Sequence, residues 1–158
     1  MQLVVADARA MERLGAAVAE CARAAVVVFL SGDLGAGKTT LVRGFLRRRG
    51  HEGVVKSPTF TVVEPYALGT GPAYHLDLYR INDPEELELI GVRDYFADGA
   101  TCLVEWPERG GCLLPAADVA VRIGIDGRQR QVRIEAGTAS GAGGVDCLAR
   151  VWPTPSTP

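Results

Sequence analysis

The sequence predicts an α/β fold whose mixed β-sheet is parallel in its core and antiparallel toward its C-terminal end. Residues 24–30 form an apolar run that leads directly into a glycine-rich loop and a helical pattern. Such a run is typical of a parallel strand buried on both faces. Residues 119–134 instead alternate apolar and more polar side chains around an Asp126-Gly127 turn, which is typical of an antiparallel hairpin.

The expected organisation is a single domain over residues 1–137, followed by a flexible linker and C-terminal tail over residues 138–158. With 158 residues and 47% hydrophobic side chains, the chain has enough apolar material for one core. Residues 138–144 are small or flexible, and residues 153–158 contain three prolines, so we expect disorder in this last segment.

Two helices are expected around the first core strand. Residues 8–23 carry an apolar stripe that includes Met11 and Cys21 at helical spacing. After the glycine-rich loop, residues 41–46 again place apolar side chains at helical spacing, and Gly50 is a suitable stop. The order strand, loop and helix is therefore present.

Two further strands are expected to end in a carboxylate. Residues 73–77 form a short strand pattern that ends at Asp77, and residues 101–104 form an apolar strand that is followed by Glu105. Between them, an Asp83-Pro84 pair followed by glutamates predicts the start of a short helix that extends to residue 89.

Composition excludes several classes of function. The formal charge of -2 provides no general field that would attract nucleic acid. The N-terminus lacks the pattern of an export signal, and the apolar runs are shorter than the ~18 residues of a membrane span. We therefore expect a cytoplasmic protein without a membrane partner. Its four cysteines lack zinc-site spacing, and we expect them to be reduced thiols.

The glycine-rich loop matches the phosphate-binding pattern G-x-x-x-x-G-K-[ST] at every fixed position. The matching residues are Gly32, Asp33, Leu34, Gly35, Ala36, Gly37, Lys38 and Thr39. Glycines allow the backbone N–H groups to approach phosphate oxygens, the lysine adds a positive charge, and the following helix directs its positive end at the anion. The pattern predicts a three-layer fold like that of P-loop NTPases.

A triphosphate bound with Mg²⁺ also needs a carboxylate opposite the hydroxyl of Thr39. Glu105 is expected to be the direct or water-bridged partner of the metal. Asp77 is expected to position the attacking water or to share the metal shell. Both carboxylates should lie near the loop, because the ends of parallel strands and the loop share one edge of the sheet.

Several other residues leave alternatives open. Thr59 and Thr61 belong either to a mobile segment that senses the terminal phosphate or to a strand that begins after a proline. Arg80 either stabilises negative charge during phosphoryl transfer or forms a helix cap or ion pair. His75 is either a satisfied structural histidine, which we favour, or a base.

The sequence favours ATP over GTP. Guanine-specific switches of this class usually carry an N-K-x-D element, but Asn82 is the only asparagine and Asp83 follows it. A small-molecule kinase is the alternative, although residues 64–77 leave little room for the lid of such an enzyme. A nucleotide-gated binding module, in which hydrolysis is incidental, is a third possibility.

Five stretches resemble the bacterial tRNA threonylcarbamoyladenosine biosynthesis ATPases of the TsaE family. They are GDLGAGKTT at residues 32–40, SPTFT at 57–61, HLDLYR at 75–80, DPEELE at 83–88 and VEWP at 104–107. The resemblance implies a compact P-loop fold with weak ATPase activity that works in a complex with the TsaD and TsaB proteins. Through that complex, it would act indirectly on tRNA to modify the adenosine beside the anticodon.

The resemblance also assigns roles to residues. Thr39 and Glu105 would hold Mg²⁺, and Asp77 would be needed for hydrolysis together with Glu105 and Lys38. The ATP-binding set would comprise Asp33, Leu34, Gly35, Ala36, Gly37, Lys38, Thr39 and Thr40, with Asp7 and Arg128 also approaching the nucleotide. Trp106 would be an aromatic residue beside the nucleotide or facing a partner, with a core position as the alternative.

Overall fold

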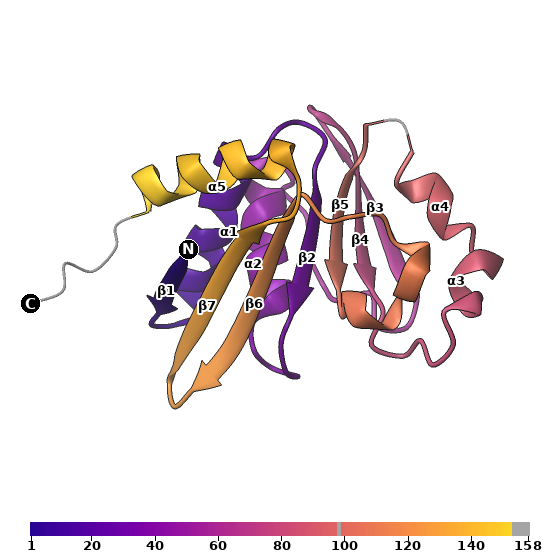
Figure 1. The fold of residues 1–158 in the computed structure, drawn as a ribbon, viewed down its shortest axis with the longest axis horizontal. Coiled ribbons are helices and arrows are strands. Elements are labelled where there is room, and N and C mark those ends of the chain that lie inside the picture. Colours follow the sequence, from indigo (N-terminus) through magenta and orange to yellow (C-terminus); the bar gives the residue numbers. More distant parts are fainter. Residues whose placement is uncertain (98, 153–158) are drawn as a thin grey trace, which may run out of the picture.

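Within residues 1–97 and 99–152, which the computed structural model describes, seven strands form one mixed sheet in the order β1-β7-β6-β2-β5-β4-β3 (Figure 1). The strands are β1 (Gln2–Val5), β2 (Val27–Ser31), β3 (Val63–Leu68), β4 (Gly71–Asp77), β5 (Thr101–Glu105), β6 (Val119–Asp126) and β7 (Gln129–Ala136). The helices are α1 (Ala8–Cys21), α2 (Lys38–Arg48), α3 (Glu85–Leu89), α4 (Val92–Tyr95) and α5 (Ala139–Val151). In these described ranges, no helix has both the length and the apolar character needed to cross a bilayer.

The predicted fold class is confirmed. Strand β2 pairs in parallel with β5 and β6, and β5 pairs in parallel with β4. Strands β6 and β7 pair antiparallel, as expected for the C-terminal hairpin, and β1 pairs antiparallel with β7. The sheet also has two edge strands, of which the sequence analysis did not predict β1 and left β3 open as a strand that begins after a proline. Strand β1 is only four residues long, and β3 forms an antiparallel hairpin with β4.

The strands at the centre have side chains packed on both of their faces, as a three-layer fold requires. Val28 and Leu30 of β2 belong to a hydrophobic cluster that includes side chains of α1, α2 and α5. Phe29 on the opposite face packs against a second cluster, to which α3 and α4 contribute Leu87 and Val92. In Figure 1, α3 and α4 lie at the β3–β4 side of the molecule, and α5 lies at the β7 side.

Helices α1 and α2 pack so closely that each needs a glycine at the contact. A Cβ on Gly15 would lie 2.0 Å from the carbonyl oxygen of Leu41, and a Cβ on Gly44 would lie 2.0 Å from that of Glu12. The same Glu12 accepts a hydrogen bond from Arg43 at 3.1 Å. These contacts fix α2, and therefore also the loop that precedes it.

The expectation of a flexible segment from residue 138 is wrong for residues 139–151, which form α5. The Oγ1 atom of Thr138 caps the helix by accepting a hydrogen bond from the N–H of Gly141 at 3.1 Å. Leu148 anchors the helix in the core cluster. The glycines that suggested flexibility are compatible with α5 because the cap and this packing supply what intrinsic helix propensity does not. The expected disorder of residues 153–158 lies outside the described residues.

The expectation that all cysteines are reduced thiols is wrong for two of them. Cys21 at the end of α1 and Cys147 in α5 form a disulfide across 126 residues of sequence. Cys102 and Cys112 are free. Burial raises the pKa of the Cys102 thiol to about 12, which keeps it protonated and unreactive.

We expect Cys21→Ser to lower the stability of the oxidised protein. Because the bond closes a long loop in the unfolded chain, its loss should reduce the free energy of unfolding by about 2–4 kcal/mol. Urea denaturation of both proteins without reductant measures the difference, and Cys112→Ser, at an exposed position, is the matched control. If reductant destabilises the wild type no more than the Cys21→Ser variant, the pairing is refuted.

Candidate functional site

The glycine-rich loop joins β2 to α2 through backbone conformations that L side chains rarely adopt. Gly32, Gly35 and Gly37 have φ values of 144°, 78° and 112°. A Cβ at Gly32 would also lie 2.3 Å from the carbonyl oxygen of Ile123. The loop therefore requires these glycines, and it leads into the first turn of α2, whose N–H groups have no partners within the helix.

Lys38 lies beneath this loop and is almost entirely buried. Its Nζ donates hydrogen bonds to the carbonyl oxygens of Gly32 at 2.6 Å and Asp33 at 2.9 Å. The ammonium also lies 4.0 Å from the centre of the Trp106 ring. Burial lowers the pKa of Lys38, and the carboxylates of Glu105 and Asp77 oppose this shift. The loop thus holds a cation between an aromatic face and two acidic groups.

Glu105 connects the end of β5 to the start of α2. Its Oε1 atom accepts a hydrogen bond from Thr39 Oγ1 at 2.8 Å. The same oxygen lies 2.9 Å from His75 Nε2. Only 3% of Glu105 is exposed, so these partners, and not solvent, provide the hydrogen bonds that its carboxylate needs. The parallel register places Asp77 of β4 directly beside Glu105, which brings the two predicted carboxylates together.

Asp77 is held by the segment that precedes β3. Its Oδ2 atom accepts hydrogen bonds from the hydroxyl of Ser57 and from that of Thr59, the latter at 2.9 Å. Its Oδ1 atom accepts the N–H of Tyr79 at 3.0 Å. The two hydroxyls also contact each other at 2.7 Å. Residues 57–59 therefore belong to the same polar network as the strand-end carboxylate.

These groups line one cavity of about 260 Å³. Its walls come from the glycine-rich loop, the start of α2, the Ser57 segment and the ends of β4 and β5. The lining includes the predicted residues Leu34, Gly35, Gly37, Lys38, Thr39, Thr40, Asp77 and Glu105, together with Trp106. The cavity thus combines one ammonium group and two carboxylates with helical N–H groups, a set that suits an anionic ligand accompanied by a cation.

The oxygen donors in this cavity fit Mg²⁺. Thr39 supplies a hydroxyl and Glu105 a carboxylate, and hard cations such as Mg²⁺ prefer oxygen ligands. Mg²⁺ in sites of this kind usually keeps several waters and is shared with phosphate, so two protein ligands are sufficient. The residues present are therefore compatible with the metal ligands expected from the sequence.

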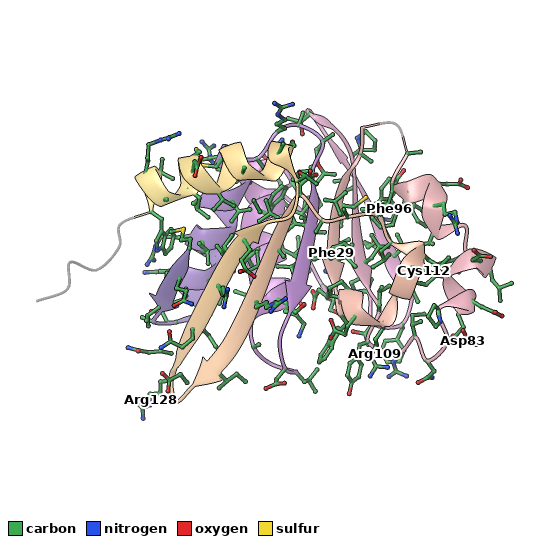
Figure 2. The ribbon with its side chains drawn as sticks, in the orientation of Figure 1. Phe29, Asp83, Phe96, Arg109, Cys112 and Arg128 are labelled. Atoms are coloured by element: carbon green, nitrogen blue, oxygen red, sulfur yellow. A yellow bond between two sulfur atoms is a disulfide. The ribbon has the colours of Figure 1, made fainter. Side chains whose placement is uncertain are left out.

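A second hollow of about 120 Å³ lies on the other side of the loop. It is lined by Asp7, Met11, Ala36 and Arg128, and it shares Gly35, Gly37 and Thr40 with the first cavity. Asp7 is also the N-cap of α1, because its Oδ1 accepts the N–H of Ala10 at 2.7 Å. Figure 2 shows Arg128 at the tip of the β6–β7 hairpin, so this wall depends on a distant part of the chain.

The sequence analysis missed Arg130, which contacts the phosphate-binding loop directly. Its Nε donates a hydrogen bond to the carbonyl oxygen of Ala36 at 3.1 Å. Its Nη2 lies 3.4 Å from the carbonyl oxygen of Gly35. No short motif marks this residue. The sequence signal is its position at the start of the return strand, two residues after Arg128 of the turn.

The structure shows where Arg80 and the Thr59–Thr61 segment lie, whose roles the sequence left open. Arg80 lies over the exposed ring of Phe60, with 4.3 Å between its guanidinium carbon and the ring centre. Thr59 contacts Asp77, whereas Thr61 is exposed in the turn before β3. Residues 57–61 therefore form a loop that directs the hydroxyls of Ser57 and Thr59 at Asp77, and the strand begins later, at Val63.

Comparison with known proteins identifies the family. Residues 5–133 match the family described as threonylcarbamoyl adenosine biosynthesis protein TsaE. A Haemophilus influenzae relative, named tRNA threonylcarbamoyladenosine biosynthesis protein TsaE, is 52% identical over 117 residues, which cover 74% of each chain. An Aquifex aeolicus relative of the same name is 36% identical over 125 residues, covering 77% of this chain and 86% of the relative.

The solved structures include a similar fold. The crystal structure of YdiB from Bacillus subtilis has a TM-score of 0.81 and 28% sequence identity, and the match covers 95% of this chain and 94% of YdiB. Sequence and structure thus agree, and the chain belongs to the TsaE family of threonylcarbamoyl adenosine biosynthesis proteins.

Proposed function

We propose that this protein is a Mg²⁺-dependent ATPase that acts with TsaD and TsaB to form threonylcarbamoyladenosine beside the anticodon of tRNA. The observation that carries the proposal is the hydrogen bond from Thr39 to Glu105, which joins the phosphate-binding loop to a strand-end carboxylate. The names of its relatives refer to the same tRNA modification. The tRNA would be reached indirectly, through the complex, and the cytoplasmic location stays a prediction from the sequence.

In this proposal, the loop and Lys38 bind the triphosphate. The first N–H groups of α2 and the helix dipole favour an anion at the loop. Lys38 would exchange its bonds to the carbonyl oxygens of Gly32 and Asp33 for bonds to phosphate oxygens. Because the burial of Lys38 disfavours its charged form, a phosphate anion would stabilise the ammonium that the carboxylates already support.

Thr39 and Glu105 would hold Mg²⁺, which when bound neutralises charge on the outer phosphates. Asp77 would orient the attacking water, since its carboxylate faces the same cavity. Ser57 and Thr59 hold one oxygen of Asp77, and the Tyr79 N–H holds the other. This arrangement limits the rotation of the carboxylate and keeps it directed at the cavity.

The nucleoside would occupy the second hollow, against Met11 and Arg130. The hollow shares loop residues with the phosphate cavity, so one ligand can occupy both. The base is proposed to be adenine, because the N-K-x-D element is absent from the sequence. The single asparagine, Asn82, lies just before α3, where its backbone N–H donates a hydrogen bond to Glu86 Oε1 at 3.1 Å.

A small-molecule kinase is the alternative function for the same loop. Residues 63–77, where an acceptor lid would have to be inserted, form the tight β3–β4 hairpin instead. This hairpin favours water over a metabolite as the acceptor. A nucleotide-gated binding module differs from both in that hydrolysis would not be required for its role.

Phosphate release separates these functions. We expect the purified chain to release phosphate slowly from ATP with Mg²⁺ in the absence of any acceptor, and faster when TsaD and TsaB are added. A coupled phosphate assay measures both rates. An absolute requirement for a metabolite acceptor would instead identify a kinase.

Replacing Lys38 should weaken nucleotide binding. The Lys38→Ala variant loses charge-assisted hydrogen bonds, each of which contributes about 1.5–3 kcal/mol, so we expect ATP affinity to fall roughly 10- to 100-fold. Calorimetric titration with ATP and Mg²⁺ measures the change, with Lys56→Ala as the matched control outside the cavity. Equal losses in the two variants would contradict the role of Lys38.

Replacing Asp77 should separate hydrolysis from binding. The Asp77→Asn variant keeps the shape of the side chain but removes its charge, so we expect ATP binding to be retained and hydrolysis to fall about 10²- to 10⁴-fold. Single-turnover hydrolysis is the measurement, and Asp83→Asn provides an exposed control carboxylate. Full tRNA modification by Asp77→Asn despite lost hydrolysis would favour the nucleotide-gated module.

A further inference from the structure

We propose that His75 is a positioning residue that orients the Glu105 carboxylate for its role as a metal ligand, an inference that rests on the function proposed above. His75 lies inside β4, and its side chain is completely buried. Its register partner is Leu103, two residues before Glu105 on β5, so His75 and Glu105 are diagonal neighbours on one face of the sheet. The Nε2 atom of His75 lies 2.9 Å from Oε1 of Glu105.

The chemistry of this contact fixes which nitrogen carries the proton. An ionised carboxylate only accepts hydrogen bonds, so Nε2 of His75 must donate. Among the described residues, Nδ1 of His75 is buried without a hydrogen-bond partner. The opposite tautomer would leave a buried N–H unsatisfied and would place a lone pair against the Glu105 oxygen. The tautomer with its proton on Nε2 satisfies both constraints.

An isolated packing role accounts poorly for a histidine at this position. A buried polar atom without a partner destabilises the folded protein, and an apolar side chain of similar size would avoid that cost. What the imidazole offers in return is its contact with Glu105. A histidine at position 75 therefore lowers stability somewhat but orients the Glu105 carboxylate.

Glu105 needs such support because its side chain is long. Fixing a glutamate in one rotamer costs side-chain entropy, and the hydroxyl of Thr39 comes from a different element, α2. His75 supplies a second donor to the same oxygen from a rigid, buried strand. Two donors on Oε1 fix the plane of the carboxylate before any ligand arrives. Partners of this kind orient metal ligands, and their loss typically costs 10- to 100-fold in metal affinity.

The test compares His75→Gln, His75→Leu and the wild type. In glutamine, Nε2 is separated from Cα by as many bonds as Nε2 in histidine, so His75→Gln can still donate to Glu105. His75→Leu fills the space without a donor. The probe is a fluorescent ATP analogue, titrated first with EDTA and then at increasing MgCl₂.

We expect all three proteins to bind the analogue equally in EDTA, which also shows that the variants are folded. The MgCl₂ concentration needed for half of the Mg²⁺-dependent rise in affinity should increase roughly 10- to 100-fold in His75→Leu and stay near the wild-type value in His75→Gln. If His75→Leu needs no more MgCl₂ than the wild type, the role of His75 is overturned while the proposed function stands. Failure of the wild type to bind the analogue at any MgCl₂ concentration would instead overturn the proposed function.

A second measurement does not depend on the stability of the variants. Nitrogen-15 NMR of the wild-type protein reports which ring nitrogen of His75 is protonated. The account requires the proton on Nε2. A proton on Nδ1 alone would overturn the proposal, because the ring could not donate to Glu105.

Discussion

The hydrogen bond between Thr39 and Glu105 joins two parts of the chain that are 66 residues apart, and the arrangement of the site depends on it. One end lies in the first turn of α2, the other at the end of β5. The parallel register of β2, β5 and β4 aligns Leu30, Glu105 and Asp77 at the same edge of the sheet. A cation or phosphate bound there would contact groups that the sheet has already aligned.

Two strained residues border this edge. Val62 and Trp106 have φ values of 66° and 57°, which are uncommon for residues other than glycine and unfavourable for a β-branched valine. Each is held by backbone hydrogen bonds: Val62 accepts one from the N–H of Asp77, and Trp106 donates one to Leu30. These turns lead the chain past Asp77 and place the Trp106 ring against Lys38. Strain of this kind commonly persists at functional sites, where the surrounding structure over-determines the backbone.

The sequence was most informative where the physical signal is local. The loop glycines, the apolar strand and the helix after it lie within one short segment, and the rule that parallel strands end at one edge was enough to bring Asp77 and Glu105 together. Contacts between residues far apart in the sequence left no local pattern from which they could be predicted. The Cys21–Cys147 disulfide depends on where α5 packs, and α5 itself was hidden by its glycines. Arg130 reaches the loop only because of the length and direction of the β6–β7 hairpin.

The central claim is that one edge of the sheet binds ATP and its cation, and a crystal structure with a non-hydrolysable ATP analogue and Mn²⁺ tests it most directly. Mn²⁺ substitutes for Mg²⁺ and can be located by its anomalous scattering. The account predicts one Mn²⁺ bound to Thr39 Oγ1, with Glu105 as a direct or water-bridged partner, and the triphosphate over the loop between Gly32 and Thr39. An analogue bound away from this loop, or Mn²⁺ bound to phosphate but remote from Thr39 and Glu105, would contradict it.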